Sequence, residues 1–284
     1  MSVEERIGVF DIGGTKTRFA IASDESAKDL TGVKTLATPF DYGAFIEMAH
    51  SLVSGAGAPM KALGVSFGVG MRNGVVEAAS KMPDFVGRNI AEDLRLIVNA
   101  PVTVHHDCIC VLAGLASDIK DGESIGYVTV STGVGAATVT NADGVQFFQR
   151  LRLAHHVVDA HSQERCKCGR TGCLAAFIDS ARWRERGVDL TAVTDVSFWN
   201  DYVQVLAVGL ANLCRMFGLS ELHVGGGVTR NMHVRPRLIE EVSSQLPDDG
   251  YPRARVAILE DEDLAPLRGA CQATALKRAV FREY

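Results

Sequence analysis

The sequence has no run or stripe of basic residues, and its formal charge of −5 comes from acidic and basic side chains mixed along 284 residues. We therefore expect no nucleic-acid partner, because proteins that bind nucleic acid gather Lys and Arg on one face. No apolar stretch is long enough to cross a bilayer, so no membrane association is expected. The opening segment MSVEERIGVF lacks the apolar region of a signal peptide, which favours a cytoplasmic chain.

A disulfide framework is also not expected. The chain has seven cysteines, an odd number, and a cytosolic protein of this size rarely forms disulfides. Cys214 and Cys271 lie in apolar helical patterns, VLAVGLANLCRMF and LRGACQATAL. We interpret both as small buried hydrophobic residues.

Short apolar segments rich in Val and Ile alternate with helical patterns along the chain, and this alternation predicts an α/β fold. A strand, a Gly/Thr turn and a second strand begin each half, at VFDIGGTKTRFAIAS and at TVSTGVGAATVTNADG. This repetition indicates two similar α/β domains with a cleft between them. We place the first domain at residues 1–118, completed by a C-terminal helix at about 265–284, and the second at 119–264.

Three glycine-rich turns, each following an apolar strand, are candidate nucleotide-binding loops. Glycine lets the backbone approach a ligand, and successive N–H groups can hold phosphate oxygens. Each turn alone would be interpreted as a tight hairpin, and neither a Walker A signature nor a complete GxGxxG motif is present. Asp11, at the end of its strand, could hold Mg²⁺ through water. The candidate residues are Asp11, Gly13, Gly14, Thr15 and Lys16, then Ser131, Thr132, Gly133 and Gly135, then Gly225, Gly226 and Gly227.

The order of motifs resembles the ROK family of sugar kinases and related repressors, within the actin-like ATPase (ribonuclease H-like) fold. The matching segments are FDIGGTKTRFAI, LGVSFGVGMRNGVV, HHDCICVLAG, VSTGVGAATV, the His–Cys cluster described below, HVGGGVTRN and APLRGACQAT. The resemblance implies transfer of the γ-phosphate of ATP, with Mg²⁺, to a primary hydroxyl of a small sugar-like substrate by a homodimer. ROK repressors carry an N-terminal helix-turn-helix. Here the first candidate phosphate loop begins only ten residues from the start of the sequence, so we expect no DNA-binding segment before it. A regulator without catalysis is the alternative.

Asp107 is the candidate catalytic residue. It follows the strand PVTVHH and begins a helical pattern, so its carboxylate could accept a proton from a hydroxyl or cap the helix. The spacing does not separate these roles, and both can hold. The resemblance matches Asp107 to the catalytic Asp of sugar kinases. It matches Asn89 to a sugar-contacting Asn, for which a helix cap is the alternative, and it places His106 where the family has Asn.

The segment CKCGRTGC places Cys166, Cys168 and Cys173 within eight residues, and His156 precedes the first by ten. One nitrogen and three sulfurs form a closed tetrahedral zinc set, which predicts a structural site rather than a catalytic one. A disulfide would leave one cysteine unpaired, and a redox switch has no further signature. The ROK resemblance implies zinc on this pattern. We choose His156 over His155 because of the spacing and the following VVD.

The residues beside this cluster depart from the resemblance. Leu153 and Ala175 stand where hexose-specific members have Glu, and His155 stands at a Gly position. A buried hydroxyl without a partner costs about 1–3 kcal/mol. A pocket lined by Leu153, Ala175 and His156 would therefore disfavour glucose. We expect a C7 cyclitol, an amino sugar or another non-glucose monosaccharide, and an ordinary hexose kinase is the first alternative.

Overall fold

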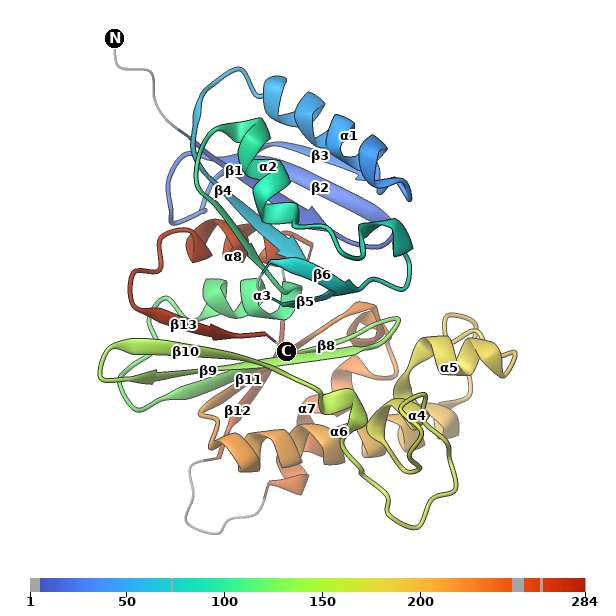
Figure 1. Cartoon of the computed structure of the whole chain (residues 1–284). Helices are drawn as coiled ribbons and strands as arrows, with labels where there is room; N and C mark the ends of the chain where they lie inside the picture. The colour runs from blue at the N-terminus through green and yellow to red at the C-terminus, as the bar shows by residue number, and fades with distance from the viewer. Residues whose placement is uncertain (1–5, 73, 247–252, 261–262, 284) are drawn as a thin grey trace. The chain divides into compact units, whose positions relative to one another are not determined.

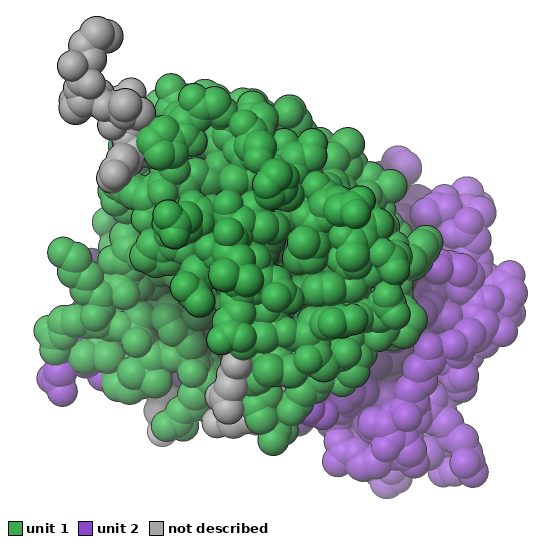
Figure 2. All heavy atoms as spheres, turned by 45° about the horizontal axis from the view of Figure 1, so that its top comes forward, with its two compact units in different colours: residues 1–118, 145–150, 263–284 green, residues 119–144, 151–262 purple. Residues whose placement is uncertain are grey.

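The computed structural model describes residues 6–72, 74–246, 253–260 and 263–283. Figure 1 shows the order of its helices and strands along the chain. The chain forms two compact units (Figure 2): unit 1 contains residues 1–118, 145–150 and 263–284, and unit 2 contains residues 119–144 and 151–262. Residues 145–150 thus belong to unit 1, whereas the sequence placed them in the second domain. Each unit contains strands and helices, so the α/β class is confirmed.

Unit 1 is built on a five-stranded sheet. In spatial order the strands are β3 (Leu30–Ala37), β2 (Lys16–Ala22), β1 (Arg6–Ile12), β4 (Met60–Phe67) and β7 (Val102–His105). The β1–β2–β3 segment is antiparallel, and β4 and β7 run parallel to β1. Because β1, β4 and β7 are parallel, their C-terminal ends lie at one edge of the sheet. Asp11 lies near that end of β1, and Asp107 follows the end of β7. A short hairpin, β5 (Gly70–Arg72) and β6 (Val75–Ala78), follows β4.

Helices cover both faces of this sheet (Figure 1). One face is covered by α1 (Tyr42–Ser54), the 3₁₀ turn η1 (Pro83–Phe85) and α2 (Ile90–Val98), and the other by α3 (Asp107–Leu115) and α8 (Ala265–Ala273). Alternate residues of β1 pack on opposite sides, as a strand covered on both faces requires. Phe10 packs in the cluster that contains Phe45 of α1, and Val9 packs with Leu267 and Cys271 of α8.

Helix α8 lies in direct backbone contact with β4 and α3. A Cβ atom on Gly64 of β4 would lie 2.1 Å from the carbonyl oxygen of Ala270, and one on Gly269 would lie 1.6 Å from that of Cys110. No larger residue fits at either position, because real Cβ atoms do not approach other heavy atoms so closely. The C-terminal part of the chain therefore fixes α3, the helix that begins with Asp107. Strand β13 (Ala279–Arg282) follows α8 and pairs in parallel with β10 (Val145–Leu151).

Unit 2 contains a sheet in the order β12 (Arg255–Ile258), β11 (Glu221–Gly225), β8 (Ser124–Val130) and β9 (Val134–Ala142). Strands β8 and β9 form an antiparallel hairpin, and β11 is parallel to both β8 and β12. Its remaining elements are η2 (Leu153–His155), α4 (Leu174–Ile178), α5 (Ser180–Glu185), α6 (Val196–Phe217), η3 (Gly227–Arg230) and α7 (Arg235–Gln245). Helix α6 supplies more of the core than any other element, and its Trp199, Leu206 and Leu210 are fully buried.

The two expected hairpins and the burial of Cys214 and Cys271 are confirmed here. The two expected hairpins are β1–β2 and β8–β9, with the Gly/Thr turns at their tips. All seven cysteines are free, and both Cys214 and Cys271 are buried. Among the helices of the described residues, none is long and apolar enough to cross a membrane.

Candidate functional site

Asp107 is the first residue of α3, directly after the C-terminal end of β7. Its Oδ1 accepts the backbone N–H of Cys108 at 2.7 Å, so it satisfies one of the free N–H groups at the start of the helix. The side chain remains 36% exposed. The carboxylate therefore helps to start the helix and is still accessible to a ligand, so the two roles left open by the sequence are compatible.

His106 precedes Asp107 and is buried beside it. Its Nδ1 lies 2.7 Å from Oδ1 of Asp107 and 3.4 Å from the N–H of Cys108. The shorter contact favours a proton on Nδ1, donated to the carboxylate. Burial by itself raises the pKa of Asp107, but the charge of His106 and the hydrogen bonds from His106 and Cys108 hold that pKa well below its ordinary value. Asp107 is therefore ionised at neutral pH.

Glu283, close to the C-terminus, holds the junction between β7 and α3. One carboxylate oxygen lies 2.5 Å from Nδ1 of His105, and the other accepts the backbone N–H of His106 at 2.8 Å. The ring of His105 also stacks on Phe281 of β13, with centroids 3.9 Å apart. No motif in the sequence points to Glu283, because it lies 177 positions from His106 along the chain.

The turn between β1 and β2 carries the first candidate phosphate loop. The N–H of Gly13 donates to the carbonyl of Lys16 at 3.0 Å, and the hydroxyl of Thr38 donates to the carbonyl of Gly13 at 2.6 Å. These bonds fix the turn. Within the described part of the chain, the N–H groups of Gly14 and Thr15 have no hydrogen-bond partner. Both groups could therefore donate to an anion.

Asp11 lies beneath this turn. Its Oδ1 accepts the hydroxyl of Ser66 at 2.9 Å, and its Oδ2 accepts Nη1 of Arg18 at 3.0 Å. Burial raises the pKa of Asp11 and the negative charge of Asp107 adds to this, while Ser66 and Arg18 oppose it. Because the carboxylates of Asp11 and Asp107 repel each other, a hydrated cation near them would relieve the repulsion. Mg²⁺ held through water at Asp11 stays a prediction, which this repulsion supports.

The candidate loops of unit 2 surround a common pocket. Between β8 and β9, the N–H of Ser131 donates to the carbonyl of Gly133 at 2.9 Å, and the N–H groups of Thr132 and Gly133 have no partner among the described residues. A pocket of about 280 Å³ adjoins this turn. Its lining includes Ser131, Thr132, Arg184, Leu190, Trp199, Gly227 and Asn231. Gly135, expected to bind the ligand, lies within β9 and is not in the lining.

The glycines of the third loop have two different environments: two are packed in the interior, and one lines the pocket. Gly225 and Gly226 are buried, and only Gly227 reaches the pocket. Gly226 has φ +100°, and a Cβ there would lie 2.2 Å from the carbonyl oxygen of Val130. Its glycine is thus required by the backbone of β8. The sequence cannot distinguish this close packing from an approach to a ligand.

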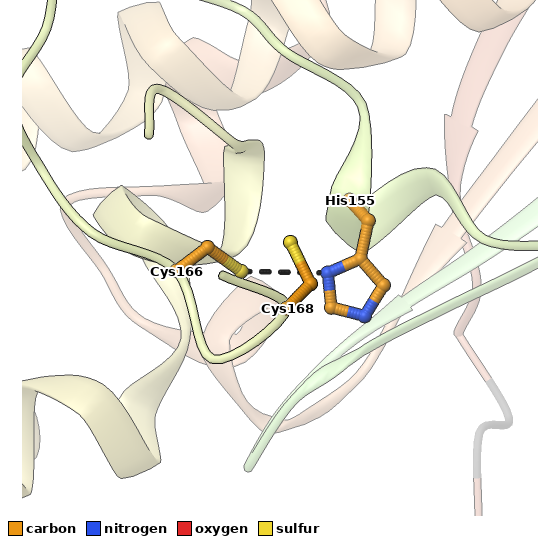
Figure 3. A group of neighbouring side chains, drawn as sticks. All are labelled: His155, Cys166 and Cys168. Atoms are coloured by element: carbon orange, nitrogen blue, oxygen red, sulfur yellow. Dashed lines mark hydrogen bonds between the residues drawn. The ribbon is translucent and has the colours of Figure 1, made fainter. Parts of the chain in front are cut away.

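The cysteine cluster lies in the loop between η2 and α4 (Figure 3). Nδ1 of His155 lies 3.4 Å from Sγ of Cys166. Sγ of Cys168 lies 3.6 Å from Sγ of Cys173, which the figure does not draw. The donor atoms of His155, Cys166 and Cys168 all lie within 4.8 Å of one another. Tetrahedral zinc, with Zn–S near 2.3 Å and Zn–N near 2.0 Å, separates neighbouring donors by about 3.5–3.8 Å. The spacing of His155, Cys166 and Cys168 therefore fits zinc, and Cys173 lies beside Cys168 outside this group of three.

The histidine at this cluster is not the one chosen from the sequence. Nε2 of His156 lies 3.1 Å from Nδ2 of Asn212 in α6, whereas His155 points toward the thiols (Figure 3). The 3₁₀ turn η2 ends at His155, and His156 has extended backbone, so the two neighbouring side chains point to different sides. Among the described residues the structure thus brings His155 rather than His156 to the thiols, and the choice of ligand between the two histidines stays a prediction.

The backbone of the cysteine loop folds into a tight turn, and its hydrogen bonds position the thiols and change the pKa of one of them. The N–H of Cys166 donates to the carbonyl of Arg170 at 2.8 Å, and the N–H of Gly169 donates to that of Cys166 at 3.0 Å. A hydrogen bond from the backbone N–H of Arg170 lowers the pKa of Cys168 to about 7. Burial raises the pKa of Cys173 to about 11. The exposed Cys168 is therefore the thiol most ready to bind a metal as thiolate.

The substrate positions expected from the sequence lie in different environments. Leu153 is only 4% exposed, belongs to the core of unit 2 and does not line either of the two pockets described here, so the structure does not support its assignment to the pocket wall. Ala175 lines a pocket of about 220 Å³. Asn89 accepts the N–H of Glu92 at 3.4 Å and caps α2, which supports the capping interpretation.

Comparisons with known proteins agree with this geometry. Residues 6–277 match the sequence model of the ROK family. The N-acetyl-D-glucosamine kinase of Shigella boydii is 26% identical over 92% of this chain and 96% of its own. The ROK hexokinase of Thermus thermophilus superposes with a TM-score of 0.72 at 24% identity, covering 94% of this chain and 97% of that chain. A ROK family glucokinase of Streptomyces griseus, solved with glucose and AMPPNP, gives 0.71 at 20% identity, covering 94% and 98%. The expected actin-like ATPase fold is confirmed.

Proposed function

The chain belongs to the ROK family, and from this premise we propose that it is an ATP-dependent kinase acting on the primary hydroxyl of a sugar-like substrate. The observation that carries the proposal is Asp107, an accessible, ionised carboxylate at the end of a parallel strand, held by His106. A group in this position can accept a hydroxyl proton. The free N–H groups of the β1–β2 turn, in the same unit, add donors for phosphate.

In the proposed reaction the substrate hydroxyl oxygen attacks the γ-phosphorus of ATP. The hydroxyl proton passes to a carboxylate oxygen of Asp107, the bond from the γ-phosphorus to its bridging oxygen breaks, and ADP leaves. Phosphoryl transfer has little need of a strong base, because the proton leaves late, so a carboxylate with a low pKa suffices. His106 keeps the carboxylate oriented and ionised. Mg²⁺, held through water near Asp11, would neutralise phosphate charge when bound.

The pocket of about 280 Å³ in unit 2 is the proposed nucleoside site. Leu190 and Val228 supply apolar surface, while Ser131, Thr132 and Asn231 supply polar groups. Such a mixture is typical of pockets for small organic ligands. The free N–H groups of Thr132 and Gly133 would donate to the phosphates of the same nucleotide.

For the acceptor we propose a C7 cyclitol, an amino sugar or another non-glucose monosaccharide. The Shigella boydii relative is an N-acetyl-D-glucosamine kinase by name, which favours the amino sugar among these. Ala175 brings no hydrogen-bonding side chain to its own part of the pocket wall, and this supports a substrate without a hydroxyl at that one position. An ordinary hexose kinase is the alternative. The homodimer and the cytoplasmic location remain predictions.

We also propose a structural zinc ion at His155, Cys166, Cys168 and Cys173. Four protein donors leave no open position for a reacting water, so the ion would stabilise the loop rather than take part in catalysis. The loop is short of other support: its small apolar cluster contains Cys166, Cys173, Ala175 and Ala176.

A coupled ADP-release assay over hexoses, amino sugars and cyclitols tests the proposed function. We expect ATP-dependent turnover of one non-glucose class with kcat/KM at least tenfold above that for glucose. Equal kcat/KM for glucose would favour the hexose kinase. No ADP release with any acceptor, from protein that binds ATP, would favour a regulator.

A further inference from the structure

A second pocket in unit 2, of about 220 Å³, is lined on one side by cations. Arg165 and Lys167 of the cysteine loop and Arg182 of α5 contribute to its wall, together with one acidic residue, Asp179. Ala175 and Ala176 form an apolar part of the wall, and Gly133 of the β8–β9 turn also borders it. His155 and Cys166, two of the proposed zinc ligands, line it as well, so the charged side chains face a cavity that adjoins the cysteine cluster.

The cations of this pocket are incompletely neutralised. Nε of Arg182 is buried and has no hydrogen-bond partner among the described residues. Its guanidinium reaches Glu185 only at 3.6 Å. Within the described ranges Arg165 has no ion pair. Lys167 pairs with Glu185 at 2.8 Å, but both side chains are exposed, and such pairs contribute little and can exchange for a ligand. A buried guanidinium N–H without an acceptor is unfavourable and calls for one.

Two simpler explanations of this charge do not account for it. Asp179 could neutralise Arg182, but among the described residues the two form no ion pair, and Oδ1 of Asp179 instead accepts the N–H of Ala181 at 2.8 Å and caps α5. The cations could balance the thiolates of the cysteine cluster, but Arg170 has that role, because hydrogen bonds to Cys168 and Cys173 raise its pKa. Arg170 does not line the pocket. Arg165 and Arg182 thus remain available to a ligand.

We propose that this pocket binds an oxyanion group, namely a phosphate, sulfate or carboxylate. Guanidinium groups bind such oxyanions through paired N–H donors, and Lys adds a point charge. The oxyanion is either an acidic substituent of the acceptor, in which case the inference rests on the proposed function, or a separate small anion.

Calorimetric titration of the zinc-loaded full-length protein with inorganic phosphate at low ionic strength tests the proposal. We expect saturable binding that weakens at least tenfold in Arg182→Gln and in Arg165→Gln. Arg237→Gln, an exposed change of equal charge in α7 outside both pockets, should leave the affinity unchanged. Unfolding temperature and zinc content identify any variant that fails to fold, and the other arginine variant then decides the test.

A second titration, in saturating AMPPNP, separates this pocket from the proposed nucleotide site. If phosphate still binds in the presence of AMPPNP, the pocket is a separate site. If AMPPNP abolishes phosphate binding, the proposal is overturned. Weak phosphate binding that is equal in wild type and in both arginine variants would indicate an adventitious ion only. This result also overturns the proposal. Competition of phosphate with acid-bearing acceptors identifies the substrate as the source, and absence of competition identifies a free anion. Because the titrations need no turnover, they are independent of whether kinase activity is found.

Discussion

Nδ1 of His106 lies 2.7 Å from Oδ1 of Asp107, and the backbone N–H of the same histidine donates to Glu283 at 2.8 Å. The proposed base is therefore linked through His106 to the C-terminal segment of the chain. His106 keeps the pKa of Asp107 low against the effect of burial. Glu283 in turn fixes the backbone from which both side chains extend.

Replacing His106 tests the first link. In wild type the low pKa keeps Asp107 ionised as the pH falls, so the acid limb of kcat lies at low pH. His106→Ala removes the hydrogen bond and the charge, so the pKa of Asp107 rises and the acid limb moves to higher pH. The pH profile of kcat between pH 4 and 8, at saturating ATP and acceptor, measures this shift. An unmoved acid limb would show that His106 does not control the ionisation of Asp107.

Replacing Glu283 tests the second link. Glu283→Gln keeps the size of the side chain but weakens its charge-assisted bonds to His105 and His106, so the β7–α3 junction should loosen. We expect kcat to fall about tenfold, a typical cost of a misplaced catalytic group, with little change in the KM for ATP. Glu240→Gln, an exposed change in α7, is the matched control. Equal kcat in all three proteins would contradict a positioning role.

The two adjacent histidines give a direct test of the metal assignment. His155→Ala should lose zinc and lower the unfolding temperature, because three thiols hold the ion less tightly than four donors. His156→Ala should keep about one zinc per chain, because its ring contacts Asn212 instead. Metal analysis of the purified variants reads out the difference. The opposite pattern would restore His156 as the ligand.

Replacing Leu153 tests whether this residue packs in the core of unit 2 or lines the acceptor pocket. Because it is only 4% exposed and packs in the core of unit 2, Leu153→Ala should lower the free energy of unfolding by about 2–5 kcal/mol. The KM for the acceptor should change little. Urea unfolding and steady-state kinetics provide the two measurements. A large rise in KM with unchanged stability would place Leu153 at the substrate after all.

Much of the fold could be predicted because its signals are local. The alternation of apolar strands and helical patterns predicts the α/β class, and the Gly/Thr turns predict the β1–β2 and β8–β9 hairpins. Asp107 could be placed at the end of a strand because PVTVHH ends directly before it. The cysteine spacing indicates a cluster because three ligands fall within one short loop.

The rest depends on directions and contacts that no local pattern carries. His155 and His156 are neighbours, and only the turn η2 decides which ring meets the thiols. Leu153 is apolar in either environment, so its type cannot separate core from pocket. Gly226 is explained by the backbone of Val130, which lies in another strand. Glu283 meets His106 across 177 positions of the chain, a distance over which sequence periodicity gives no information.

The central claim is that Asp107 accepts the proton in an ATP-dependent phosphoryl transfer. The most direct measurement is ADP release by wild type and by Asp107→Asn, with the best acceptor of the panel and with AMPPNP affinity as the control for folding. The account predicts that kcat falls about 10²–10⁴-fold, as expected for loss of a general base, while AMPPNP binds as before. An Asp107→Asn protein that turns over at the wild-type rate would contradict the account.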